Sequence, residues 1–467
     1  MQFTSIPFFL FLFAVVVLYY VLPKRYRNWL LLAASYYFYF SFKAEYLIIL
    51  LGSTAFNYFT AKAMDNHPQR KKLLLGLALV FNIGLLFLFK YFNFFSDQLN
   101  ALFRSASLDI SIPKYSLILP IGISFYTFMA LGYILDVYWG DIKHQRNYLT
   151  LSLYLAFFPQ ILCGPIGRAK NLFKQFTTEH LMAYDNFANG FRLILWGLFM
   201  KMVVADNIAL YVDAIYGNIP MHSSLTLIVA ALLYPFQLYT DFGGYTNIAR
   251  GVAKLFGYDL MVNFRTPYVN STSVTDYWRR NHISLTSWVR EYVFFPFMGS
   301  STSKPKVYLG ILVMFLVMGF WHGAGWMFLI WGLIQSGYLI FEDATGLGRK
   351  KSANVIVNTL KRAATYLALA FGLMFFRLPS FKHMKEHIAN TAKFSLNFYY
   401  GSATIFTYMS FGLSILVLFE ILLNKKQFDE WIDSHRVITR WGTYLGLAVT
   451  ILLIGNLESM AFIYEKF

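Results

Sequence analysis

The sequence predicts an all-α integral membrane protein, and its composition and hydropathy pattern both indicate this fold class. Of the 467 residues, 57% are hydrophobic and only 13% are charged, whereas a soluble domain carries about 25% charged residues. Apolar runs near the length of a bilayer crossing recur along the chain. These runs are continuous rather than alternating, which excludes a membrane β-barrel. We expect one polytopic domain over residues 1–467.

The charge balance indicates membrane lipid as a partner rather than nucleic acid. The formal net charge is +17, and the basic residues cluster in short loops between the apolar runs. The positive-inside rule and attraction to anionic headgroups explain such loops without a nucleic-acid partner. The single cysteine, Cys163, excludes an intrachain disulfide and a multi-cysteine metal site. No metal ligand set is expected.

The first half of the chain is expected to cross the membrane several times. The first apolar run precedes the basic cluster KRYRN at 24–28, the reverse of the order in a cleavable signal peptide. We therefore expect a retained first helix with an extracytoplasmic N-terminus. The crossings expected next are 29–42, 46–63, 73–89 and 115–139.

The apolar stretch at 149–166 is predicted to be a re-entrant or broken element. Both of its flanks are basic, and it contains Pro159, Gly164 and Pro165, which interrupt a helix. Such backbone is tolerated at membrane depth only where protein or a water-filled cavity surrounds it.

The second half of the chain completes about eleven membrane-embedded elements. The segment from 250 to 306 is the least hydrophobic and should lie on the cytoplasmic side, and RKK at 349–351 is expected there too. The stretch at 307–341 is long enough for a helical hairpin. The further elements expected are 187–205, 223–240, 362–378, 403–423 and 441–457.

One histidine lies in a long uncharged stretch. His322 stands within MGFWHGAGWMF, and no Asp, Glu, Lys or Arg occurs from residue 307 to 341. An ionisable group at membrane depth is by default a functional candidate. A desolvated imidazole should be neutral and able to accept a proton as a general base. We expect Trp321 and Trp326 to wall a pocket around it; the alternative is a structural histidine bonded to a helix carbonyl.

A second histidine, His282, lies in DYWRRNHISLTSWVREYVFFPFMG at 276–299. On a helix this stretch would present a basic and aromatic face suited to the cytoplasmic membrane interface, a position for an interfacial amphipathic helix. His282 either reaches a pocket from that side or faces headgroups. Arg279 and Arg280 are candidates to bind an anionic cofactor, because guanidinium groups match phosphate geometry, and Asn281 adjoins them.

A weaker signal is Asp241 in LYTDFGGYTNIARG at 238–251, where it is expected at the end of an apolar helix. Helix capping, contact with a polar substrate group and orientation of a histidine all remain open for this carboxylate, and Tyr245 is placed in the same pocket. No H-E-x-x-H, G-x-x-x-x-G-K-[ST] or G-x-S-x-G motif occurs. Metalloprotease, P-loop ATPase and α/β-hydrolase functions therefore lack support.

Several motifs follow one another in a characteristic order. They are FTSIPFFLFLF, LPIGISFYTFMALGYILDVYWG, FFPQILCGPIGR, DFGGYTNIARG, YWRRNHISLTSWVREYVFFPFMG and GFWHGAGWMFLIWG, and the likeness continues to the C-terminal FIYEKF. This order resembles the membrane-bound O-acyltransferase family, and more narrowly its bacterial alginate O-acetylase branch. The resemblance implies a helical bundle around a central funnel. It also implies that His322 matches the near-universal histidine of the family and that His282 matches a second, more cytoplasmic position.

The resemblance implies an O-acyltransferase, most simply an O-acetyltransferase without a tightly bound cofactor. Acetyl-CoA, or another acyl-CoA or acyl carrier, would be the donor and would meet Arg279, Arg280, Asn281 and Trp321. The acceptor would be a hydroxyl of an alginate-like exopolysaccharide, of peptidoglycan, or of a partner protein. A periplasmic esterase-like acetyltransferase partner is also implied. The alternative from the residues themselves is an ion-coupled transporter of a polar metabolite, which would require acidic residues in the core.

Overall fold

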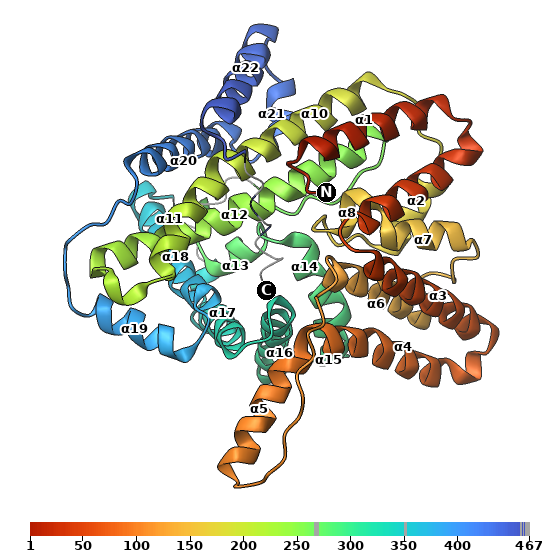
Figure 1. Cartoon of the computed structure of the whole chain (residues 1–467), viewed down its shortest axis with the longest axis horizontal. Helices are drawn as coiled ribbons and strands as arrows, with labels where there is room; N and C mark the ends of the chain where they lie inside the picture. Colours follow the sequence, from red (N-terminus) through yellow and green to blue (C-terminus); the bar gives the residue numbers. More distant parts are fainter. Residues whose placement is uncertain (266–269, 350–352, 458–459, 461, 463–467) are drawn as a thin grey trace. The chain divides into compact units, whose positions relative to one another are not determined.

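The computed structural model describes residues 1–265, 270–349, 353–457, 460 and 462. Its helices divide into two compact units (Figure 1). The first comprises Met1, Ser5–Asn186 and Ala253–Met261, and the second comprises Gln2–Thr4, Phe187–Val252 and Val262–Phe467. Every regular element in the described residues is helical, which confirms the all-α class. Residues 350–351 of RKK and 463–467 of FIYEKF lie outside the described residues, and the single polytopic domain stays a prediction.

The described residues include seven helical segments that are long and apolar enough to cross a membrane. The seven segments are Ala44–Asn66, Pro68–Ser105, Tyr184–Tyr216, Ser224–Leu255, Lys304–His322, Ala403–Leu423 and Val437–Ile454. Two shorter apolar segments, Ile6–Val21 and Tyr148–Ile161, accompany them. On the last crossing Ile438 and Leu453 are 87% and 71% exposed, as expected of side chains that face lipid. The multi-pass prediction is confirmed, whereas the predicted number of about eleven elements is not.

The first unit contains the predicted interruption. Its helices are α1 (Ile6–Val21), α2 (Lys24–Phe40), α3 (Ala44–Asn66), η1 (Pro68–Arg70), α4 (Lys71–Leu86), η2 (Phe87–Tyr91), α5 (Phe92–Ser105), α6 (Ile123–Trp139), α7 (Tyr148–Ala156), α8 (Phe158–Ile161) and α9 (Ala169–Thr177). The chain breaks at Phe157 between α7 and α8, and residues 163–168 are not helical. Residues 150–167 are buried, so protein surrounds this irregular backbone, as the membrane requires.

The second unit contains the long helices of the C-terminal half, apart from the first three residues of α10 and the last three of α12, which belong to the first unit. They are α10 (Tyr184–Leu198), η3 (Phe199–Ala205), α11 (Asp206–Tyr216), η4 (Ile219–Met221), α12 (Ser224–Leu255), α13 (Val274–Trp278), α14 (Ile283–Val289), η6 (Arg290–Phe294), α15 (Phe295–Met298), α16 (Lys304–His322), α17 (Trp326–Thr345), η7 (Leu347–Arg349), α18 (Val355–Arg377), α19 (Phe381–Thr391), α20 (Ala403–Leu423), α21 (Phe428–Asp433) and α22 (Val437–Ile454).

Helices α16 and α17 form the predicted hairpin and lie side by side (Figure 1). A Cβ atom on Gly319 would lie 2.4 Å from the carbonyl oxygen of Phe328, and one on Gly332 would lie 2.5 Å from that of Phe315. The two backbones therefore touch, which only glycine permits at these positions. His322 is the last residue of α16, at the turn of this hairpin.

Three predicted elements have different bounds in the structure. The helix expected over 115–139 begins only at Ile123, after Gly122 with a positive φ of 76°. The stretch at 276–299 is not one amphipathic helix, because His282 takes a left-handed conformation (φ 47°, ψ 48°) that separates α13 from α14. The helix expected to end near residue 240 continues to Leu255.

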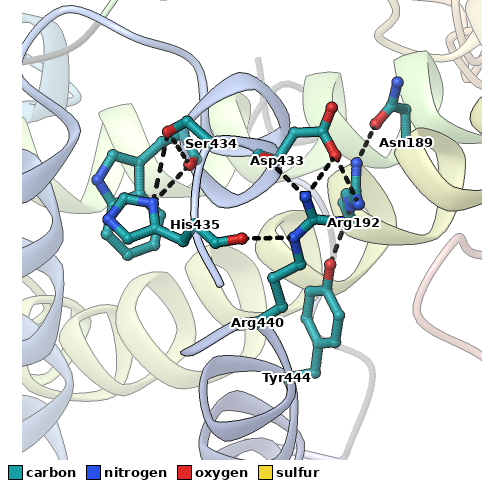
Figure 2. A network of polar contacts seen from close by, with 8 residues as sticks. Asn189, Arg192, Asp433, Ser434, His435, Arg440 and Tyr444 are labelled. Atoms are coloured by element: carbon teal, nitrogen blue, oxygen red, sulfur yellow. Dashed lines mark hydrogen bonds and ion pairs between the residues drawn. The ribbon is translucent and has the colours of Figure 1, made fainter. Parts of the chain in front are cut away.

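The buried guanidinium of Arg192 ties α10 to the C-terminal helices (Figure 2). Its Nε donates a hydrogen bond of 2.9 Å to the Tyr444 hydroxyl, and its Nη1 donates one of 2.6 Å to Asn189 Oδ1. Asp433 accepts ion pairs from Arg192 at 3.1 Å and from Arg440 at 3.3 Å. These contacts join α10, α21 and α22 within the second unit.

Candidate active site

His322 lies in an aromatic enclosure within the second unit. Its side chain is 3% exposed. The imidazole centroid is 5.0 Å from the ring of Trp321, 5.2 Å from Trp331 on α17 and 5.0 Å from Phe376 on α18, all with steep interplanar angles. These edge-to-face contacts fix the ring and exclude bulk water around it. Trp321, Trp331 and Phe376 therefore all lie against the His322 ring.

His282 is the second buried imidazole, with its centroid 6.2 Å from that of His322. The turn after it is held by Asn263, whose carbonyl oxygen accepts from the Ile283 amide at 3.0 Å and whose Oδ1 accepts from the Ser284 amide at 3.0 Å. The ring contacts Phe242 at 4.5 Å and Trp321 at 5.9 Å. His282 therefore points into protein, and it does not face headgroups.

Burial decides the charge of His282. Desolvation lowers the pKa of its imidazole from 6.5 to about 3, and a backbone hydrogen bond offsets this only in part. The ring is consequently neutral at physiological pH. A neutral imidazole offers one N–H donor and one nitrogen acceptor, which suits it to orient a substrate or to stabilise a developing negative charge.

Trp331 offers a further donor close to His322. Its side chain is 2% exposed, and its Nε1 has no acceptor among the described residues. The neighbouring indole of Trp278, by contrast, donates to Gln335 Oε1 at 3.1 Å. A buried N–H without an acceptor is costly and can bond a substrate oxygen that enters the enclosure. Trp331 is not among the site residues predicted from the sequence.

The residues predicted to bind a phosphate-bearing donor lie just before His282. Arg279 is exposed at the end of α13. Arg280 is half-buried, and its Nε pairs with Asp276 Oδ1 at 3.0 Å. Asn281 is half-buried and its backbone N–H bonds the Tyr277 carbonyl. Arg279 is therefore the residue of this group best placed to meet a soluble anion.

Asp241 belongs to a buried ion cluster rather than to a helix end. It lies inside α12, 3% exposed. Lys201 Nζ is 2.5 Å from Asp241 Oδ1 and 2.7 Å from Asp206 Oδ1, and it lies 5.3 Å from the ring centroid of buried Tyr245. Helix capping, the commonest use considered for Asp241, is excluded.

Gly244, which follows Asp241 on α12, serves close packing of this helix rather than its end. A Cβ on Gly244 would lie 2.8 Å from the Gly197 carbonyl oxygen and 3.0 Å from the Lys201 amide. Gly244 therefore allows α12 to pack against η3 rather than ending it. The π-helical segment η3 carries Lys201, and such segments are frequent at functional sites.

The structure brings most of the predicted residues together. Phe242 connects the Asp241 segment to His282, and Phe462 packs on Phe242 and Tyr245 at 5.8 and 4.7 Å. Trp326 differs, because it is 48% exposed at the first residue of α17. The described residues contain no group of three His, Cys, Asp or Glu side chains that could hold a metal ion.

Comparisons with known proteins point to acyl transfer. Residues 141–384 match the model of the membrane-bound O-acyltransferase family. The chain is 36% identical over 384 residues to "Probable alginate O-acetylase AlgI" of Pseudomonas aeruginosa, covering 81% of this chain and 72% of that protein. It is 33% identical over 407 residues to the "Peptidoglycan O-acetyltransferase" of Helicobacter pylori, covering 79% and 76%.

A more distant relative is the "Teichoic acid D-alanyltransferase" of Bacillus subtilis, 29% identical over 286 residues and covering 58% of this chain and 72% of that protein. All three relatives are transferases of acyl groups by name, which favours acyl transfer over the transporter alternative. The chain belongs to the membrane-bound O-acyltransferase family, and the protein is a membrane-embedded acyltransferase.

Proposed function

We propose that the protein transfers an acetyl group from a cytoplasmic thioester, with acetyl-CoA as the simplest donor, to a hydroxyl on the opposite side of the membrane. The observation that carries the proposal is the pair of buried imidazoles, His322 and His282, 6.2 Å apart within one aromatic enclosure. Two such rings in an enclosure that excludes water suit proton transfer and charge stabilisation.

His322 acts as the general base in this proposal. The acceptor hydroxyl oxygen attacks the thioester carbonyl carbon while His322 takes the hydroxyl proton. The tetrahedral intermediate then collapses, the carbon–sulfur bond breaks, and the proton passes from His322 to the leaving thiolate. The products are the new ester and a free thiol, so bonds and protons balance. General-base catalysis of this kind contributes roughly 10² to 10⁴ in rate.

The oxyanion of the intermediate needs preorganised donors. His282 is neutral because burial depresses its pKa to about 3, so it can supply one N–H. Trp331 supplies a second N–H that is unused among the described residues. Removal of one such donor typically costs around 3 kcal/mol of transition-state stabilisation.

The acceptor class follows from the relatives and not from the geometry. The named relatives act on alginate, peptidoglycan and teichoic acid, which are polymers of the cell envelope. We therefore propose an extracytoplasmic polysaccharide as the final acceptor in a bacterial inner membrane, reached directly or through a periplasmic esterase-like acetyltransferase. The exposed Arg279, with Arg280, meets the phosphates of the donor on the cytoplasmic side.

The test is acetyl transfer by the full-length protein in lipid nanodiscs with labelled acetyl-CoA. His322→Ala should lower the rate of thioester turnover by roughly 10² to 10⁴. His67→Ala, a change at an exposed histidine in the first unit, is the matched control and should retain the wild-type rate. A correctly inserted His322→Ala protein with wild-type turnover would refute the assignment.

A further inference from the structure

A polar cavity of about 360 Å³ lies within the first unit, at the start of α2. Its lining includes Lys24, Arg25 and Arg27 on α2, Asn147 just before α7, and residues 176–180 at the end of α9 and directly after it. This cavity is separate from the histidine enclosure, whose residues all belong to the second unit. Neither the family resemblance nor the proposed function assigns it a role.

The charge of this cavity is positive. Three side chains in the lining are cationic, and the only carboxylate among the lining residues is Glu179, which pairs with Lys24. The net formal charge of the lining is therefore +2 with histidine neutral. Lys24 is 66% exposed and keeps further N–H donors beyond its contact with Glu179. The cavity attracts an anion.

Arg27 is held in one orientation by contacts that leave part of its guanidinium available. Its Nε donates to the Leu22 carbonyl at 3.3 Å and its Nη1 donates to the His180 carbonyl at 2.8 Å. The guanidinium carbon lies 5.0 Å from the ring centroid of Tyr19. A guanidinium has five N–H donors, so others remain for a ligand. A preorganised guanidinium binds phosphate oxygens at low entropic cost.

Two helix N-termini add to the positive potential of the cavity. Helix α2 begins at Lys24, and α7 begins at Tyr148 with Asn147 as its N-cap. The partial positive charge of a helix N-terminus favours phosphate groups. On α2, Tyr26 and Trp29 are 44% and 59% exposed, as is typical of residues at a membrane–water interface. Exposed aromatic side chains beside the cavity suit a position at the depth of headgroups.

We propose that this cavity is a binding site for a phosphate group at the cytoplasmic membrane interface. The phosphate can belong to an anionic phospholipid headgroup or to a soluble nucleotide. The site itself follows from the three cations, the two helix starts and the cavity.

The test uses the full-length protein in nanodiscs and two probes. Labelled adenosine 3′,5′-bisphosphate is measured by equilibrium dialysis in phosphatidylcholine nanodiscs, and retained phosphatidylglycerol is measured by native mass spectrometry in mixed nanodiscs. Lys24→Gln with Arg25→Gln removes two cations from the lining. The matched control, Arg70→Gln with Lys72→Gln, removes two exposed cations of the same unit outside the lining.

The lining variant should weaken binding of at least one probe roughly tenfold relative to the control pair, the change that 1.4 kcal/mol produces. The probe that responds identifies the source of the phosphate. Glu179→Gln removes the carboxylate and should instead tighten binding of the same probe. Because the contacts of Lys24 with Glu179 and of Arg25 with Tyr26 lie at the surface, the variants are expected to fold.

Equal binding of both probes by the lining variant and the control pair would overturn the proposal, and so would weaker binding by Glu179→Gln. The His322→Ala protein separates this site from the proposed function. It should bind the responding probe as the wild type does, even though its acetyl transfer is lost. Loss of transfer and loss of phosphate binding are thus independent readouts.

Discussion

Replacement of Lys201 by methionine tests the buried ion cluster of the second unit. Lys201 Nζ lies 2.5 Å from Asp241 Oδ1 and 2.7 Å from Asp206 Oδ1, and the three side chains are at most 5% exposed. The change removes the cation that two buried carboxylates share. Breaking a buried ion pair from one side typically costs about 3–5 kcal/mol, so Lys201→Met should lower the free energy of unfolding by that amount.

Asp241→Asn should cost less stability than Lys201→Met. That variant keeps the Lys201–Asp206 pair and an amide oxygen where the carboxylate stood, so its cost should be about 1–2 kcal/mol. The triple variant, which adds Asp206→Asn and Asp241→Asn to Lys201→Met, carries no unpaired charge. It should recover much of the stability lost in the single lysine variant, because neutral replacements of buried charge clusters are often tolerated.

The assay is thermal unfolding of the detergent-purified variants, followed by intrinsic fluorescence, together with acetyl-transfer activity. A loss of about 3–5 kcal/mol should appear as a fall of several degrees in Tm. A Lys201→Met protein as stable as the wild type would refute the reasoning. So would an Asp241→Asn protein that is less stable than Lys201→Met, because the lysine would then not be the shared partner.

Three further predictions concern packing, protonation and catalysis. Gly244→Ala should destabilise the protein by about 1–3 kcal/mol because its Cβ would lie 2.8 Å from a backbone oxygen, whereas Gly446→Ala, with open space around it, should be neutral or stabilising in the same Tm measurement. Burial lowers the pKa of His282 to about 3 and that of His387 to about 4, below the unfolded value of about 6.5. The unfolded chain therefore binds protons that the folded protein does not, and stability should fall as pH drops from about 6.5 to 4 by roughly 3 kcal/mol for each histidine; a His387→Gln variant should show a smaller fall in Tm between pH 7 and 4. Trp331→Phe should lower the rate constant for acetyl transfer by roughly 10²-fold with little change in KM, and an unchanged rate would remove Trp331 from the proposed oxyanion donors.

The hairpin and the broken element could be predicted from the sequence because their signals are local. The uncharged run around His322 is long enough for two helices, and the structure turns at residues 323–325. Pro159 and Gly164 mark the interruption at 149–166 by their own backbone properties. Local signals of this kind do not depend on the rest of the fold.

The buried ion cluster of Lys201, Asp206 and Asp241 was not predicted, although the sequence contains a signal for it. Lys201 and Asp206 lie in the run LWGLFMKMVVADN, and an ionisable residue in an apolar run is a candidate by the reasoning applied to His322. From the sequence, this run is predicted only to cross the membrane. Asp206 and Glu420 are both buried, so the core contains acidic residues besides Asp241.

The arrangement of the candidate site depends on packing between distant segments. His282 and His322 are separated by 40 residues in the sequence. The distance between their rings depends on the left-handed backbone at His282 and on the hydrogen bond that Asn263 accepts from the turn after it. Nothing in the pattern of YWRRNHISL indicates that a helix breaks there. Likewise, the glycines after Asp241 are compatible with a helix end and with a packing surface, and only the contact with η3 distinguishes these two roles.

The touching backbones of α16 and α17 have a consequence for how the reaction proceeds. A histidine at the tip of a hairpin whose helices are in contact has little room to swing between a donor on one side and an acceptor on the other. In the proposed reaction both reactants would therefore travel to a stationary imidazole. The proposed transfer would then depend on the binding and release of the two reactants, while the hairpin stays in place.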